Sequence, residues 1–132
     1  MIILHDMQKK ALKEALRLSD EAWSNQELWE KNLSAAITVL EIELENNPDC
    51  TEAMISLGAL LSDSGKHQQA LDVLRKAESN GSEDGMLYYN LGAVLMNLGI
   101  ESREKAKAYF EKSTAMKMKP DTIRAYFDPQ AH

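Results

Sequence analysis

The amino-acid sequence predicts an all-α fold, and three features support this prediction. The 132 residues include only three prolines and six glycines, while residues that favour helices, such as alanine, leucine, glutamate and lysine, are plentiful. Runs that alternate valine, isoleucine and threonine are absent, so nothing in the sequence indicates a half-buried strand. The chain also matches itself at a shift of 34 residues, which is typical of stacked helical repeats.

Six helices are expected in three pairs, and the residues at their ends indicate where each begins and stops. The expected ranges are 6–23, 24–45, 50–64, 67–79, 85–98 and 102–117. Ser24 followed by Glu27 is typical of a capping box, which would open the second helix. Pro48 ends that helix. Gly65 and Gly99 end the third and the fifth, because the left-handed conformation at a helix C-terminus favours glycine.

The first helices of two units match each other residue by residue. The matched pairs are Met54 with Tyr88, Leu57 with Leu91, Gly58 with Gly92, Leu61 with Leu95, and Gly65 with Gly99. Gly58 and Gly92 lie inside expected helices, where glycine costs about 1 kcal/mol relative to alanine. We therefore expect another helix to approach closely there, with Ala70 and Ala106 facing the two glycines.

The second helices of the units repeat as well, with a small residue followed four positions later by a bulky one. The positions are Ala36 and Leu40, Ala70 and Leu74, and Ala106 and Phe110. The last step of this series is 36 residues, from Ala70 to Ala106, which implies a two-residue insertion near residues 100–103.

This pattern resembles the tetratricopeptide repeat, a helix-turn-helix unit of about 34 residues. The family's leucine-glycine pair appears as Leu57-Gly58 and as Leu91-Gly92. The resemblance implies one domain, a right-handed superhelix of three units at about 6–48, 51–84 and 85–119. Residues 120–132 would cap the exposed end of the stack, because a terminal repeat has no following neighbour.

In this family the first helix of each unit lines a concave groove that holds the partner. At the matching positions the groove would present Glu52, Ile55, Ser56, Ala59, Ser62, Asp63, Met86, Tyr89, Asn90, Ala93, Met96 and Asn97. Asparagine can bond a peptide backbone, and methionine adapts to irregular side chains. Tyr89 is the candidate hot spot because it is aromatic with a polar tip, whereas Tyr88 is expected in the core. Contact with the C-terminal cap is the alternative role of Met86 and Met96.

Two charged sets are expected on solvated helix faces. The acidic set is Glu41, Glu43 and Glu45, for which a docking patch is the alternative. The basic set is Lys9, Lys10, Lys13 and Arg17, which could pair within its own helix with Asp6 and Glu14.

The composition argues against several classes of function. A net charge of −6 and a pI of about 5.1 disfavour nucleic-acid binding and suit a basic partner. Cys50 is alone, and His5, His67 and His132 are far apart, so no metal site or cofactor is expected. No catalytic motif is present, so we expect no enzyme. The start lacks the pattern of a secretory signal, and no apolar stretch approaches the roughly 18 residues that span a bilayer. A cytoplasmic protein without a membrane segment is expected.

The function expected from the sequence is a protein-interaction module that binds a peptide or a folded partner in the concave groove. Small chaperones or adaptors and toxin-neutralising immunity proteins both fit this description, and the alternatives stay open. A different class is a structural scaffold that self-associates through its repeat ends. Its contact would involve Trp23, Trp29, Tyr126 and Phe127. The oligomeric state and the partner are not determined by the sequence.

Overall fold

The computed structural model describes residues 4–99 and 102–126, with side chains from residue 9 onward. This part of the chain contains six α-helices, one short 3-10 helix and no strand, so the all-α prediction is confirmed. The elements are α1 (Leu4–Ser24), η1 (Gln26–Leu28), α2 (Trp29–Asn46), α3 (Thr51–Asp63), α4 (His67–Ser79), α5 (Gly85–Leu98) and α6 (Arg103–Thr114).

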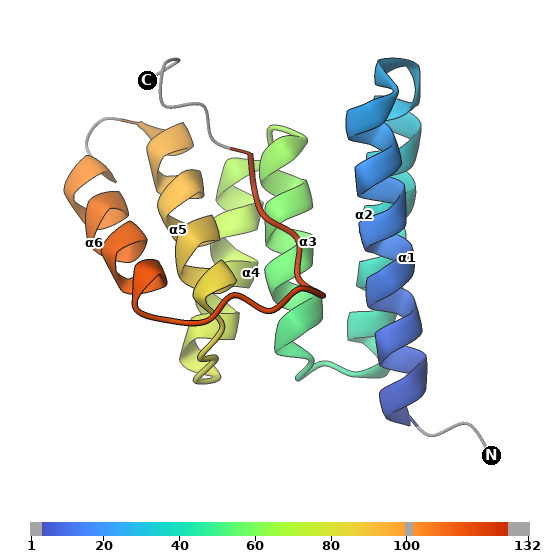
Figure 1. The fold of residues 1–132 in the computed structure, drawn as a ribbon, viewed down its shortest axis with the longest axis horizontal. Coiled ribbons are helices and arrows are strands. Elements are labelled where there is room, and N and C mark those ends of the chain that lie inside the picture. The colour runs from blue at the N-terminus through green and yellow to red at the C-terminus, as the bar shows by residue number, and fades with distance from the viewer. Residues whose placement is uncertain (1–3, 100–101, 127–132) are drawn as a thin grey trace.

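The helices pack as three antiparallel pairs that stand side by side (Figure 1). α1 pairs with α2, α3 with α4 and α5 with α6, while α3 also contacts both α1 and α5. The first helices of the pairs therefore share one face of the stack. Within the described ranges, no helix combines the length and the apolar character needed to cross a bilayer.

The repeated small residues lie in the core of the stack. Ala36, Ala70 and Ala106 are all fully buried. A Cβ atom on Gly58 would collide with the side chain of Leu74, and one on Gly92 would lie 2.8 Å from the ring of Phe110. The close approach predicted at the two glycines is therefore present.

The residues that face these glycines differ from the prediction. Ala70 and Ala106 were expected there, but the bulky residues one helical turn further, Leu74 and Phe110, fill the notches instead. The space left by the missing Cβ accepts a large side chain, and a leucine or phenylalanine placed there removes more apolar surface from water than an alanine would.

The predicted capping box between the first two helices is wrong. α1 continues through Ser24, whose hydroxyl donates to the carbonyl oxygen of Asp20. Asn25 is extended, with φ −139° and ψ 102°, and its side chain accepts from the backbone N–H of Glu27 at 3.1 Å. Asparagine and serine cap equally well, so sequence preference alone could not choose between the adjacent positions.

The acidic set on α2 is only partly solvated. Glu41 and Glu45 are exposed, but Glu43 is buried, and its Oε1 has no hydrogen-bond partner. Burial raises the pKa of the Glu43 carboxyl. The expectation of a fully solvated face is therefore wrong at Glu43, which occupies the core-facing position that a small residue takes in the next unit, at Ala77.

The chain after α6 takes a different path from the predicted cap. α6 ends at Thr114 rather than near residue 117, and hydroxyls of its last turn bond to backbone carbonyls three residues earlier. Residues 115–126, hereafter the C-terminal segment, then cross in front of α5 and α3 and turn along α3 (Figure 1). They cover the shared face of the first helices, whereas the prediction placed them over the end of the stack. Residues 127–132 of the predicted cap lie outside the described residues.

Candidate functional site

The face shared by the first helices, which the sequence predicted to be concave and which we call the concave face, holds an extended peptide, the protein's own C-terminal segment. Asn90 on α5 is fully buried and bonds this peptide on both sides. Its Nδ2 donates to the carbonyl oxygen of Ile123 at 2.8 Å, and its Oδ1 accepts from the N–H of Ala125 at 2.8 Å. Ser56 on α3 completes the contact, since its Oγ accepts from the N–H of Ile123 at 3.0 Å. Side chains of the groove thus form hydrogen bonds with the backbone of the segment.

The start of α5 anchors the beginning of the C-terminal segment. Asp84 is buried and caps α5 by accepting from the N–H of Met86. The same carboxylate accepts from the N–H of Lys119 at 2.9 Å and from the hydroxyl of Thr122 at 2.9 Å. The N–H of Gly85 donates to the carbonyl of residue 117, and a Cβ there would lie 2.7 Å from the carbonyl oxygen of residue 116. The absence of a side chain at Gly85 therefore lets the segment approach.

Asp63, at the end of α3, holds the far end of the C-terminal segment. Its Oδ1 accepts from the N–H of Tyr126 at 2.9 Å, while its buried Oδ2 has no hydrogen-bond partner. Burial raises the pKa of the Asp63 carboxyl to about 6, and the bond from Tyr126 partly offsets this rise. Glu30 and Lys66 line the small hollow beside it.

Replacing Asp63 with asparagine is expected to stabilise the protein above pH 6. Because the carboxyl pKa is higher in the folded than in the unfolded chain, the folded state holds the extra proton between about pH 4 and 6. Wild-type stability should therefore fall as pH rises through that window. Asparagine should gain roughly 1–2 kcal/mol at pH 8 and little at pH 4, measured by urea unfolding. The exposed Asp72→Asn serves as control; equal gains at both pH values for Asp63→Asn would contradict the prediction.

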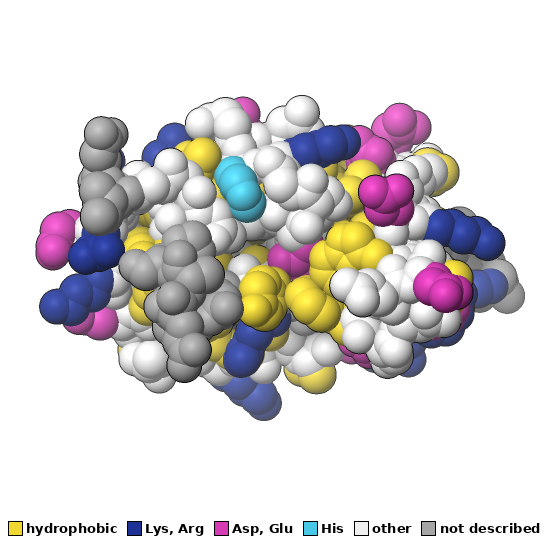
Figure 2. Space-filling model, turned by 90° about the horizontal axis from the view of Figure 1, so that it is seen from above, with side chains coloured by type: hydrophobic (Ala, Val, Ile, Leu, Met, Phe, Trp, Pro, Cys, Tyr) yellow, Lys and Arg dark blue, Asp and Glu magenta, His cyan; other side chains and the backbone are white. Residues whose placement is uncertain are grey.

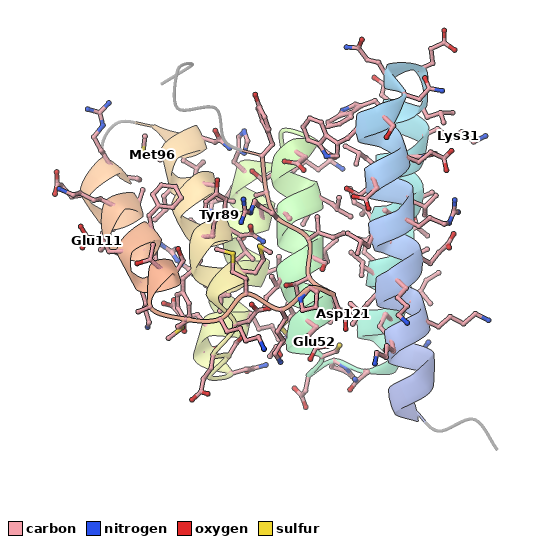
Figure 3. The ribbon with its side chains drawn as sticks, viewed as in Figure 1. Lys31, Glu52, Tyr89, Met96, Glu111 and Asp121 are labelled. Atoms are coloured by element: carbon pink, nitrogen blue, oxygen red, sulfur yellow. The ribbon has the colours of Figure 1, made fainter. Side chains whose placement is uncertain are left out.

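The predicted groove residues are brought together, but most are covered by the C-terminal segment or by neighbouring helices. Buried are Ile55, Ser56, Ala59, Ser62, Met86, Asn90 and Ala93, while Glu52, Asp63, Tyr89, Met96 and Asn97 are partly exposed. Tyr89 lies beside the segment (Figure 3), with the guanidinium carbon of Arg124 4.8 Å from its ring centre. Tyr88 is buried, as expected, and donates to the carbonyl of Ser82. The concave face is therefore not an open groove in this structure.

A second feature lies where the C-terminal segment meets the first unit. Trp23 at the end of α1 contacts Trp29 at the start of α2, with ring centres 4.5 Å apart and planes at 82°. Tyr126 of the segment also contacts Trp23, with ring centres 5.2 Å apart. We call these three residues the aromatic corner. Trp23 is 49% exposed and Tyr126 53%, and apolar side chains gather on this end of the molecule (Figure 2).

The aromatic corner borders a hollow of about 850 Å³. Glu27 of η1 and Glu30 of α2 line it beside the rings. The extended Asn25 and the short η1 place Glu27 there, so the helix break that the capping box prediction missed helps to shape the hollow. Three of the four residues predicted for a self-association contact are thus neighbours; the fourth, Phe127, lies outside the described residues.

The histidine, cysteine and acidic side chains form no metal site in the described part of the chain. No three of its histidine, cysteine, aspartate and glutamate side chains are grouped to hold a metal ion. Cys50 is buried, and burial raises the pKa of its thiol. His67 Nδ1 lies 3.2 Å from the hydroxyl of Ser62. The side chain of His5, and His132, lie outside the described residues.

The sequence prediction missed Asp84 and the role of residues 119–126. The sequence does contain a local signal for Asp84, since aspartate just before a helix is a preferred N-cap residue. The C-terminal contacts have no local signal, because the N–H of Ile123 meets a hydroxyl 67 residues earlier in the chain.

Comparison with known proteins supports the fold. No family model matches the chain, and no curated protein matches it. A solved structure, MamA MSR-1 C2, is similar with a TM-score of 0.55 over 83% of this chain and 67% of that one, at 18% sequence identity. MamA contains tetratricopeptide repeats. The fold is a tetratricopeptide-like helical repeat.

Proposed function

We propose that the protein is a protein-interaction module that docks its partner on the aromatic corner. The observation that carries this proposal is the exposure of Trp23 and Tyr126 around a hollow, next to a concave face that the chain itself fills. Tryptophan and tyrosine are the residues most enriched at binding hot spots. Both tryptophans of the chain lie in this corner.

The filled concave face supports a docking surface outside it. Departure of the C-terminal segment with nothing in its place would break the hydrogen bonds that Asn90, Ser56 and Asp84 make to it, each worth about 0.5–1.5 kcal/mol. An arriving peptide would also compete with a tethered one, whose effective concentration is in the millimolar range or above. Docking on the corner avoids both costs.

The fold class fits this proposal without an enzymatic role. Proteins that share the repeat present a surface for another protein, and no catalytic constellation was expected from the sequence. Chaperone, adaptor and toxin-neutralising roles all require such a surface, and the identity of the partner would distinguish them.

A capture experiment from the source cell tests the proposed surface. Trp23→Ala is expected to reduce recovery of a specific partner by about tenfold or more, as loss of a hot-spot residue does. Ile42→Ala is the matched control, because Ile42 is also an exposed apolar residue, at 51%, on α2. Tyr89→Ala is run alongside. A partner lost with Tyr89→Ala and retained with Trp23→Ala would place the site on the concave face instead.

Self-association through the same corner is the second candidate function. It is favoured by the contact of Trp23 and Tyr126, which belong to opposite ends of the chain and together form one exposed apolar surface. Sedimentation velocity of the chain alone would show a dimer that Trp23→Ala dissociates. A monomer at all concentrations would remove this candidate.

A further inference from the structure

The hollow at the aromatic corner combines aromatic rings with carboxylates. Trp23, Trp29 and Tyr126 border it, and Glu27 and Glu30 stand on its rim. Both glutamates are exposed, and neither takes part in an ion pair among the described residues. The faces of indole and phenol rings carry negative potential, so rings and carboxylates favour the same kind of ligand, a cation.

None of the lysine and arginine side chains that the structure describes lines this hollow. Basic groups line two adjoining hollows that share residues with this one. Lys66 lines one of them with Trp29 and Glu30, and Arg124 lines the other with Trp23 and Tyr126. The end of α1 and the start of α2 also meet here, and their opposite partial charges largely offset each other. The charged side chains that line the hollow itself are therefore the two glutamates.

A purely apolar ligand fits this chemistry less well. A leucine or phenylalanine seated on the rings would bring apolar surface against Glu27 and Glu30 and would strip water from their carboxylates without replacing it. An arginine side chain suits both the rings and the carboxylates, since its guanidinium stacks on aromatic faces and donates hydrogen bonds to carboxylates. The chain's net charge of −6 would attract a basic partner to this surface.

We propose that the aromatic corner binds a cationic side chain, arginine before lysine, presented by a basic segment of a partner protein. This inference rests on the proposed function and names the chemistry of the partner. The indole rings supply cation–π contact, and Glu27 and Glu30 supply hydrogen-bond acceptors and charge.

Intrinsic fluorescence of the 132-residue chain tests the inference, because its only two tryptophans border the hollow. The probes are three blocked pentapeptides without tryptophan, Gly-Ala-X-Ala-Gly, in which X is arginine, glutamine or leucine. The arginine peptide is expected to change the emission saturably, with half-saturation at a concentration roughly fivefold lower than either other peptide requires.

Charge variants separate specific binding from general attraction to an acidic protein. In the double variant Glu27→Gln with Glu30→Gln, the preference for the arginine peptide over the glutamine peptide should fall to about twofold, because only the ring contacts remain. The matched control is Glu41→Gln with Glu45→Gln, which removes the same charge from exposed positions elsewhere on α2 and should leave the preference unchanged. Thermal unfolding of each variant checks that the fold is retained.

Each outcome decides the inference independently of the proposed function. Equal response to all three peptides, or a stronger response to the leucine peptide, would overturn the cationic ligand. An equal loss in both double variants would overturn it too, because attraction to net charge would then explain the preference. The capture experiment with Trp23→Ala reports on the docking surface in either case.

Discussion

Replacing Leu74 with alanine is expected to lower the free energy of unfolding by about 2–5 kcal/mol, the cost of emptying a closely packed leucine site. Leu74 is fully buried, and its side chain fills the notch above Gly58. Neither helix can close the gap by itself, because each is also packed against the next pair. Chemical denaturation measured by circular dichroism checks this value. Leu98→Ala is the control, since Leu98 is 40% exposed and its truncation should cost far less.

A double-mutant cycle with Gly58 tests the packing itself. Gly58→Ala alone should gain little or destabilise, because the new methyl group collides with Leu74 and cancels the higher helix propensity of alanine. In the Leu74→Ala background the same change should stabilise by about 1 kcal/mol, since the collision is gone. Additive effects of the two substitutions would show that these residues do not form the contact described.

Replacing Asn90 with alanine is expected to release the C-terminal segment and to cost about 2–4 kcal/mol of stability. The substitution removes the acceptor of the Ala125 N–H and the donor to the Ile123 carbonyl, both in a buried position. These backbone groups can regain partners only by leaving the concave face for water. Hydrogen exchange at residues 119–126 should therefore rise well above that of wild type.

Tryptophan emission should change in the same variant, because release of the segment moves Tyr126 away from Trp23. Asn97→Ala is the matched control, since Asn97 lies two turns further along α5 and makes one long bond, 3.4 Å to Ser62. Unaltered exchange at residues 119–126 in Asn90→Ala would mean that side-chain packing alone holds the segment.

The Asn90→Ala variant also tests whether the concave face influences the aromatic corner. Tyr126 belongs to the corner, but it is held there by the C-terminal segment and by Asp63. A variant that releases the segment should therefore weaken binding at the corner without changing Trp23, Trp29, Glu27 or Glu30. The concave face would then position part of the proposed docking surface.

Much of the helical framework could be predicted because its signals are local and repeated. Gly58 and Gly92, spaced by one unit, marked the close helix approaches, and the recurring alanines marked the core. The errors occurred where several local solutions are nearly equal. Asn25 rather than Ser24 caps η1, and the larger Leu74 rather than Ala70 fills the notch.

The sequence by itself determined the all-α class, the three helix pairs and the repeat register, because these depend on propensity, periodicity and spacing along the chain. Only the tertiary structure decided what covers the concave face. The N–H of Ile123 reaches Ser56 and that of Tyr126 reaches Asp63, over separations of 67 and 63 residues. These bonds use backbone N–H groups, which nearly every residue type carries. No residue type in the segment therefore indicates them in the sequence. They form because a buried polar groove must satisfy its hydrogen bonds, and the chain's own C-terminal segment is the peptide held closest to it.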